Sequence, residues 1–149
     1  MTRLDEALMG VTALGFDTSP FIYFIERHPA HVDVMREVIR RVDVGEIAGF
    51  CSVITLTEVM TRPMQMGDRR LEHAYRSLLQ HSRHFALAPI DEATAYQAAV
   101  LRARYKLRTP DALQMAAAIR CGCQAFITND QALTRVQELR VLLVEEMSI

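Results

Sequence analysis

The chain of 149 residues alternates between short apolar runs and longer segments in which apolar side chains recur every three to four positions. The short runs have the length and the β-branched and aromatic content of strands, whereas the longer segments have the periodicity of helices. Short strands that alternate with helices favour a mostly parallel sheet covered by helices on both faces. Five strands are predicted in this way, over residues 11–16, 50–54, 85–90, 124–128 and 141–144.

Capping residues and helix breakers predict where the helices begin and end. Ser19, Asp68 and Asp91 are predicted N-caps. A capping box formed by Thr55 and Glu58 is expected to open a helix that ends near Pro63. On the helix that follows Asp91, helical spacing predicts a buried stripe made of Ala95, Tyr96, Ala99, Val100 and Ala103.

One helix, TPDALQMAAAIRCG (residues 109–122), is unusually apolar. Thr109 is the expected N-cap, Pro110 suits the first helical position, and Gly122 suits a left-handed stop. Eight of the eleven side chains from residue 111 to residue 121 are apolar, which predicts a buried helix. Its first turn nevertheless carries the carboxylate of Asp111. This group either interacts favourably with the helix dipole or faces a bound cation.

Length, charge and cysteine content narrow the class of protein. A chain of this size with 50 % hydrophobic residues forms one domain, and a net charge of −1 gives no overall attraction to nucleic acid or membrane. Three cysteines without a C-x-x-C pair predict neither a thiolate zinc site nor a disulfide framework. The chain has no secretory signal and no apolar run that approaches the ~18 residues of a membrane span, so we expect a cytoplasmic protein without a membrane partner.

Four carboxylates lie at junctions between predicted elements. Asp17 and Asp130 follow strands, whereas Glu58 and Asp111 lie in the first turns of helices. Each has a structural alternative, as a helix cap, a turn residue, a capping-box member or a dipole partner. In an open parallel sheet, however, strand ends and the following helix starts share one edge, so at least Asp17, Glu58 and Asp130 are expected to converge.

Converging carboxylates repel one another unless they are protonated or neutralised. Arg108 is the only basic residue close to them in sequence, and it could contact a phosphate, pair with one of the acids or be solvated. We therefore expect a hard divalent cation to neutralise the converging carboxylates. Oxygen ligands without histidine or cysteine favour Mg²⁺ or Mn²⁺. Such a site is typical of phosphodiester hydrolysis.

Four segments together resemble one known family. LGFDTSPFIYFIE, SVITLTEVM, LRTPDALQMAAAI and AFITND are similar, in this order and spacing, to motifs of the PIN-domain ribonucleases, especially the VapC-type toxins of toxin–antitoxin pairs. The resemblance implies a PIN-like three-layer α/β sandwich over residues 11–149, with residues 1–10 as an N-terminal extension. It also implies an acidic metal site whose residues are Asp17, Glu58, Asp111 and Asp130, supported by Thr18 and Thr128.

The resemblance further implies a Mg²⁺- or Mn²⁺-dependent endoribonuclease that cuts RNA, often a homodimer and often inhibited by a small antitoxin protein. One alternative is a PIN-fold RNA-binding module with little or no turnover. A second is a receiver-like phosphotransfer domain, which is disfavoured because the only lysine, Lys106, lies in a predicted helix rather than at a strand end.

Overall fold

A five-stranded sheet forms the centre of the protein in the computed structural model, which describes residues 1–149. All neighbouring strands are parallel, and their order across the sheet is β3-β2-β1-β4-β5. The prediction of a mostly parallel sheet is therefore confirmed. The strands are β1 (Ala13–Phe16), β2 (Ala48–Ser52), β3 (Phe85–Ala88), β4 (Ala125–Thr128) and β5 (Arg140–Leu143).

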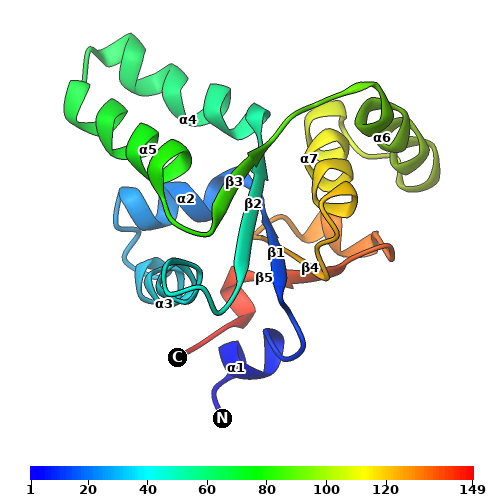
Figure 1. Ribbon diagram of the computed structural model, residues 1–149, viewed down its shortest axis with the longest axis horizontal. Coiled ribbons are helices and arrows are strands. Elements are labelled where there is room, and N and C mark those ends of the chain that lie inside the picture. The colour runs from blue at the N-terminus through cyan, green and yellow to red at the C-terminus, as the bar shows by residue number, and fades with distance from the viewer.

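Helices cover both faces of this sheet, as expected for a three-layer α/β sandwich (Figure 1). One layer lies on the left of Figure 1 and contains α2 to α5, and the other lies on the right and contains α6 and α7. None of the helices combines the length and the hydrophobicity that a membrane-spanning segment requires. The helices are α1 (Arg3–Ala7), α2 (Thr18–Ile25), α3 (Val32–Asp43), α4 (Val53–Met66), α5 (Arg69–His81), α6 (Glu92–Tyr105) and α7 (Thr109–Arg120), with 3-10 turns η1 (Gln131–Arg135) and η2 (Val144–Glu146).

The strands alternate their side chains between two separate cores, one on each face of the sheet. Leu14 and Phe16 of β1 point into the larger core, beneath α2 to α5. Phe126 of β4 points into the smaller core, beneath α6 and α7. Gly15 lies between Leu14 and Phe16 and faces the smaller core, where a Cβ atom would come within 2.6 Å of the Ala118 Cβ. The missing side chain therefore allows α7 to approach the sheet closely.

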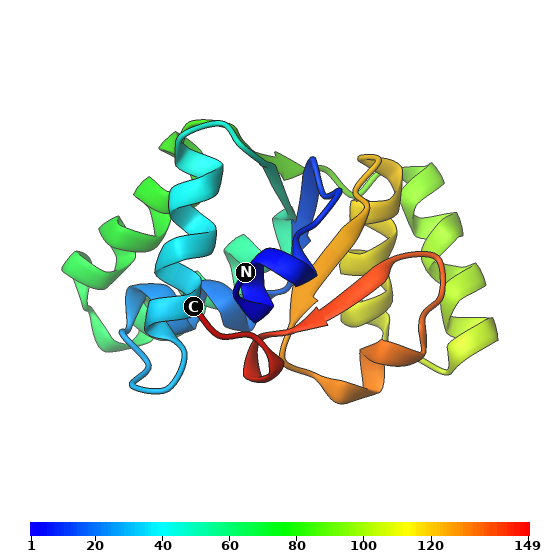
Figure 2. The ribbon, with the colours of Figure 1, turned by 90° about the horizontal axis from the view of Figure 1, so that it is seen from below.

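The N-terminal segment packs against the larger core. Leu4 is completely buried and Leu8 is nearly so. The Leu4 N–H also donates to the Ser148 carbonyl at 3.1 Å, and Asp5 pairs with Arg41 of α3. Figure 2 shows α1 beside the C-terminal end of the chain. Residues 1–10 thus contribute buried side chains to the domain that they precede.

The structure corrects the prediction for α4. The helix begins at Val53, directly after β2, and ends at Met66, so it includes Pro63 and stops at the left-handed Gly67. The expected capping box does not form, because Thr55 and Glu58 already lie within the helix. Their side chains are engaged in tertiary hydrogen bonds instead. Pro63 is buried, and the helix continues past it for another three residues.

The helix starts are confirmed in part. Asp68 and Asp91 cap α5 and α6 as predicted, by accepting from the N–H groups of Leu71 and Thr94. Ser19 is wrong as a cap, because Asp17 caps α2. For α7 the N-cap position is taken by Arg108, so Thr109 is already the first helical residue.

The predicted buried stripe of α6 is wrong. Ala95, Ala99 and Ala103 are exposed, and Tyr96 is 76 % exposed. Helix α6 packs mainly against α7 and needs only a narrow apolar strip for this contact. The residues that are buried instead are Thr94, Ala98 and Leu101.

Candidate acidic metal site

Asp17 follows β1 at the point where the strand order reverses, since β1 lies between β2 and β4. Ligands bind at this switch point in open parallel sheets. Its backbone N–H donates to the Ile127 carbonyl at 2.9 Å, which fixes the residue against β4. Oδ1 accepts from the Thr18 N–H at 2.8 Å, and Oδ2 accepts from the Thr128 hydroxyl at 2.7 Å. Asp17 is therefore both the cap of α2 and the innermost carboxylate of the sheet edge.

The electrostatic environment of Asp17 disfavours its ionised form. Burial raises the pKa of this carboxyl above its ordinary value, and the negative charges of Asp111 and Glu58 raise it further. The hydrogen bonds from Thr128 and Thr18 act in the opposite direction but do not cancel the effect. A positive charge placed among these groups would reverse the balance and favour the carboxylate.

Glu58 reaches the same edge from the second turn of α4. Its Oε1 accepts from the Thr18 hydroxyl at 2.9 Å. Thr18 is buried, and its hydroxyl also lies 3.0 Å from that of Thr55. The two hydroxyl positions implied by the family resemblance, Thr18 and Thr128, thus each contact an acidic side chain.

Asp111 lies in the first turn of α7, and its side chain is only 13 % exposed. Its Oδ2 accepts from the Nε of Arg108 at 3.0 Å, and Asp111 raises the pKa of this guanidinium. Asp130 and Glu58 raise the same pKa further. Arg108 is therefore paired with one of the acids, while its own side chain remains 78 % exposed.

Asp130 follows β4 and caps η1 by accepting from the Ala132 N–H at 2.9 Å. Its own N–H donates to the Thr128 hydroxyl at 3.1 Å, and that hydroxyl donates to Asp17. The two aspartates that follow strands are thus connected through one threonine. Both aspartates therefore act as helix caps and also lie at the shared carboxyl edge of the sheet.

No three histidine, cysteine, aspartate or glutamate side chains lie close enough together to form a metal-coordinating group as they stand. The donor chemistry nevertheless fits a divalent cation. Mg²⁺ is usually held by one or two carboxylates, with water and substrate oxygens completing its shell. The negative charges that raise the Asp17 pKa come from Asp111 and Glu58, and Arg108 is the one cation paired with this group.

Gln114 is the functional candidate that sequence reasoning missed. It lies one turn after Asp111 on α7, is 3 % exposed, and donates from Nε2 to Asp17 and Glu58, each at 3.2 Å. A signal was available in the sequence, because Gln114 is the only uncharged polar residue between Asp111 and Cys121.

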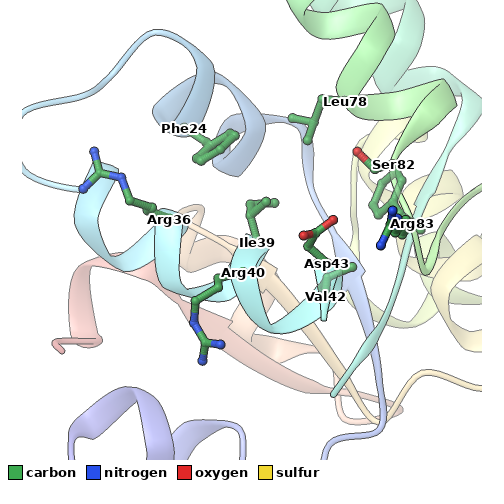
Figure 3. Close-up of a pocket in the computed structure, with 10 residues that line it drawn as sticks. Phe24, Arg36, Ile39, Arg40, Val42, Asp43, Leu78, Ser82 and Arg83 are labelled. Atoms are coloured by element: carbon green, nitrogen blue, oxygen red, sulfur yellow. The ribbon is translucent and has the colours of Figure 1, made fainter. Parts of the chain in front are cut away.

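A second feature lies away from the acidic edge, between α2, α3, α5 and β3. It is a cavity of about 250 Å³ with an apolar floor and three arginines and one aspartate at its rim. Figure 3 shows Phe24, Ile39 and Leu78 facing one another across this cavity. The rim residues are Arg36, Arg40, Asp43 and Arg83.

The sequence profile of the PIN domain matches residues 16–139, which include all four acids. The chain belongs to the PIN-domain family. This is a family of nucleases, and the motif-based recognition is confirmed at this level. None of the curated protein sequences matches the chain.

Three solved structures of similar fold contain a toxin–antitoxin complex or VapBC. A chain of a toxin–antitoxin complex from Klebsiella pneumoniae is 25 % identical with a TM-score of 0.66, over 89 % of this chain and 97 % of that one. A chain of VapBC2 from Rickettsia felis, bound to a DNA fragment from the promoter, is 15 % identical with a TM-score of 0.69, over 88 % and 98 %. A chain of DNA-bound VapBC from Salmonella typhimurium is 18 % identical with a TM-score of 0.70, over 90 % and 98 %. The last two show likeness of fold.

Proposed function

We propose that this PIN-domain protein is a Mg²⁺- or Mn²⁺-dependent endoribonuclease and the toxin of a toxin–antitoxin pair. The observation that carries the proposal is the geometry at the switch point, where the Gln114 Nε2 lies 3.2 Å from both Asp17 Oδ1 and Glu58 Oε1, and Thr128 links Asp17 to Asp130. Burial and the charges of Asp111 and Glu58 disfavour the ionised form of Asp17, and a bound cation would offset this cost. The likeness to chains of toxin–antitoxin complexes supports the biological role.

Each part of the site has a distinct task in this proposal. Asp17 and Asp111 hold the cation most directly, and Glu58 and Asp130 complete the negative region around it. A divalent cation there supplies Lewis acidity toward the phosphodiester and acidifies water. Thr18 and Thr128 donate hydrogen bonds that fix the carboxylates in orientation. The exposed guanidinium of Arg108 is free to leave Asp111 and contact an RNA phosphate.

RNA cleavage by the purified chain tests this proposal. Labelled single-stranded and hairpin RNA are incubated with Mg²⁺ or Mn²⁺, wild type, Asp17→Asn and Asp111→Asn. Both substitutions should lower cleavage by more than about 100-fold, the upper end for loss of an outer-shell partner. Asp68→Asn is the matched control, because it removes a carboxylate charge but asparagine still caps α5. Cleavage that persists in both site variants would refute the metal site.

A PIN-fold RNA-binding module with little turnover is the second candidate. Two observations favour it, namely the absence of a preformed cluster of metal ligands and the Arg108–Asp111 ion pair. RNA that binds without forming products at saturating Mn²⁺ would select this alternative.

We also propose that a small antitoxin protein inserts an apolar side chain into the cavity between α2, α3 and α5. The apolar floor suits such an anchor, and Arg83 at the rim favours an acidic residue beside it, whereas Arg36 and Arg40 are already paired with Asp33 and Glu37. Ile39→Asp would place a charge on this floor and is expected to abolish binding of the antitoxin while RNA cleavage persists. Arg120→Asp, on exposed α7 surface away from the cavity, serves as the control. Unchanged antitoxin binding by the Ile39 variant would refute this location.

Two further parts of the proposal concern assembly and compartment. We propose a homodimer, supported by exposed apolar side chains along α4, namely Val53, Met64 and Met66. Light scattering of wild type and of Met64→Asp tests it, and a monomeric wild type would refute it. We place the protein in the cytoplasm, because its RNA substrate lies there and all three cysteines are free thiols.

A further inference from the structure

Gln114 makes more side-chain hydrogen bonds than any other residue at the acidic edge. It lies on the face of α7 that covers β2, and its amide is almost completely buried among polar groups of three other segments. A buried amide is costly unless both of its ends are satisfied. Both ends of the Gln114 amide have hydrogen-bond partners.

The oxygen end of the amide is anchored by two hydroxyl groups. Oε1 accepts from the Ser52 hydroxyl at 3.0 Å and from the Thr55 hydroxyl at 2.8 Å. Both hydroxyl donors are buried, and they come from the end of β2 and the first turn of α4. A hydroxyl group can either donate or accept, so these two contacts alone do not determine which end of the amide faces them.

The acids determine the orientation, because an ionised carboxylate only accepts hydrogen bonds and therefore requires the nitrogen end of the amide. Nε2 donates toward Asp17 Oδ1 at 3.2 Å, Glu58 Oε1 at 3.2 Å and the Thr18 hydroxyl oxygen at 3.0 Å. An amide has two N–H groups, so these three acceptors share them. One side chain therefore links the end of β1 and helix α4 to α7, which also carries Asp111.

We infer that Gln114 is a positioning residue that holds the Asp17 and Glu58 carboxylates toward a shared cation. This inference rests on the proposed metal site. An amide is suited to the task because it donates hydrogen bonds without cancelling the negative charge that binds the cation. A lysine or arginine at this position would neutralise the acids, and an apolar side chain would leave them only the hydrogen bonds from Thr18 and Thr128.

The test measures metal affinity rather than cleavage. Mn²⁺ is titrated calorimetrically into wild type, Gln114→Met and Met115→Leu. Methionine keeps the length of glutamine but removes both ends of the amide. Loss of an outer-shell partner costs about 10- to 100-fold in metal affinity, and we expect a loss in this range for Gln114→Met. Met115→Leu changes the adjacent buried residue, which faces the smaller core, and should leave the affinity unchanged.

Ser52→Ala provides a milder variant in case Gln114→Met does not melt cooperatively. It removes one of the two hydroxyl anchors of the amide oxygen without touching a carboxylate. We expect a smaller loss of Mn²⁺ affinity, about threefold. Wild-type affinity in every variant that folds would overturn the inference, and so would a wild type that binds no Mn²⁺.

The failure of this inference can be distinguished from that of the proposed function. If Gln114→Met weakens Mn²⁺ binding but neither the wild type nor any variant cuts RNA, the positioning role stands and the nuclease proposal is refuted. If wild type cuts RNA and Gln114→Met binds Mn²⁺ as tightly as wild type, the nuclease proposal stands and the positioning role is overturned.

Discussion

A single methyl group at Gly15 should separate α7 from the sheet. In Gly15→Ala the new Cβ would lie 2.6 Å from the Ala118 Cβ and 3.0 Å from a ring carbon of Phe126, whereas ordinary contact begins at 3.4 Å. Helix α7 would therefore have to move by about 0.8 Å, the difference between 3.4 and 2.6 Å. Overpacking of this kind costs about 1–3 kcal/mol. Reduced freedom of the unfolded chain offsets about 0.4–1 kcal/mol of this cost.

The same displacement should weaken the acidic site. Helix α7 carries both Asp111 and Gln114, and the Gln114 Nε2 lies 3.2 Å from the Asp17 carboxylate. A shift of about 0.8 Å along this direction would leave the two atoms about 4.0 Å apart, beyond hydrogen-bonding distance. We therefore expect Gly15→Ala to lower Mn²⁺ affinity as well as stability, although Gly15 contacts neither the cation nor the acids.

Urea denaturation of a double-mutant cycle measures the steric origin of the effect. Ala118→Gly alone should cost about 1 kcal/mol, because it places a glycine inside a helix. When Gly15→Ala and Ala118→Gly are combined, the methyl group added on β1 occupies the space that the Ala118 methyl vacates. The combined loss should therefore be smaller than the sum of the single losses by about 1–2 kcal/mol. Strictly additive losses would refute the close approach of α7 to β1.

Three further predictions test other parts of the structure. Leu4→Ala should lower the free energy of unfolding by about 2–5 kcal/mol in urea titrations, because Leu4 is fully buried in the larger core; a loss typical of a surface site would show that residues 1–10 are a separable extension. With a chelator present, the contribution of Asp17 to stability should fall as pH rises from its ordinary pKa of 3.8 through its raised folded-state pKa, because the folded protein retains a proton that the unfolded chain has released. The difference between the wild-type and Asp17→Asn curves isolates this contribution, since Asp5 and Glu37 have lowered pKa values and act in the opposite direction in both proteins. A difference that does not change with pH would contradict the burial effect. Arg108→Ala should strengthen Mn²⁺ binding by about two- to fivefold in calorimetry, since it removes the cation that pairs with Asp111; weaker binding would contradict this competition.

The arrangement of the sheet edge was predictable because parallel strands impose it. Once Asp17 and Asp130 were placed after strands, their approach followed from the shared carboxyl edge, and the structure joins them through Thr128. The position of Asp111 was less accessible to sequence reasoning, because it follows a turn between two helices. Its approach to Asp17 depends on how closely α7 lies on the sheet, which Gly15 and Ala118 determine.

Local patterns failed where tertiary contacts override them. Thr55 and Glu58 have the spacing of a capping box, yet β2 leads directly into α4, so both residues lie one turn further along the helix than expected. The apolar spacing on α6 identified the wrong face, because alanines there give almost no directional signal. The buried face of α6 is decided by its partner α7, which sequence periodicity does not describe.

Gln114 illustrates how much the sequence of a buried helix reveals about its surroundings. In a helix that is apolar on nearly every side, an uncharged polar side chain must find partners, because a buried amide without hydrogen bonds is strongly destabilising. The existence of Gln114 therefore predicts a polar region beneath α7. Its partners could not be identified from the sequence, because Ser52 and Asp17 lie 62 and 97 residues away. Only the parallel sheet brings those residues to the same edge, and there the amide meets two carboxylates, which determine its orientation, together with the hydroxyl groups that satisfy its oxygen.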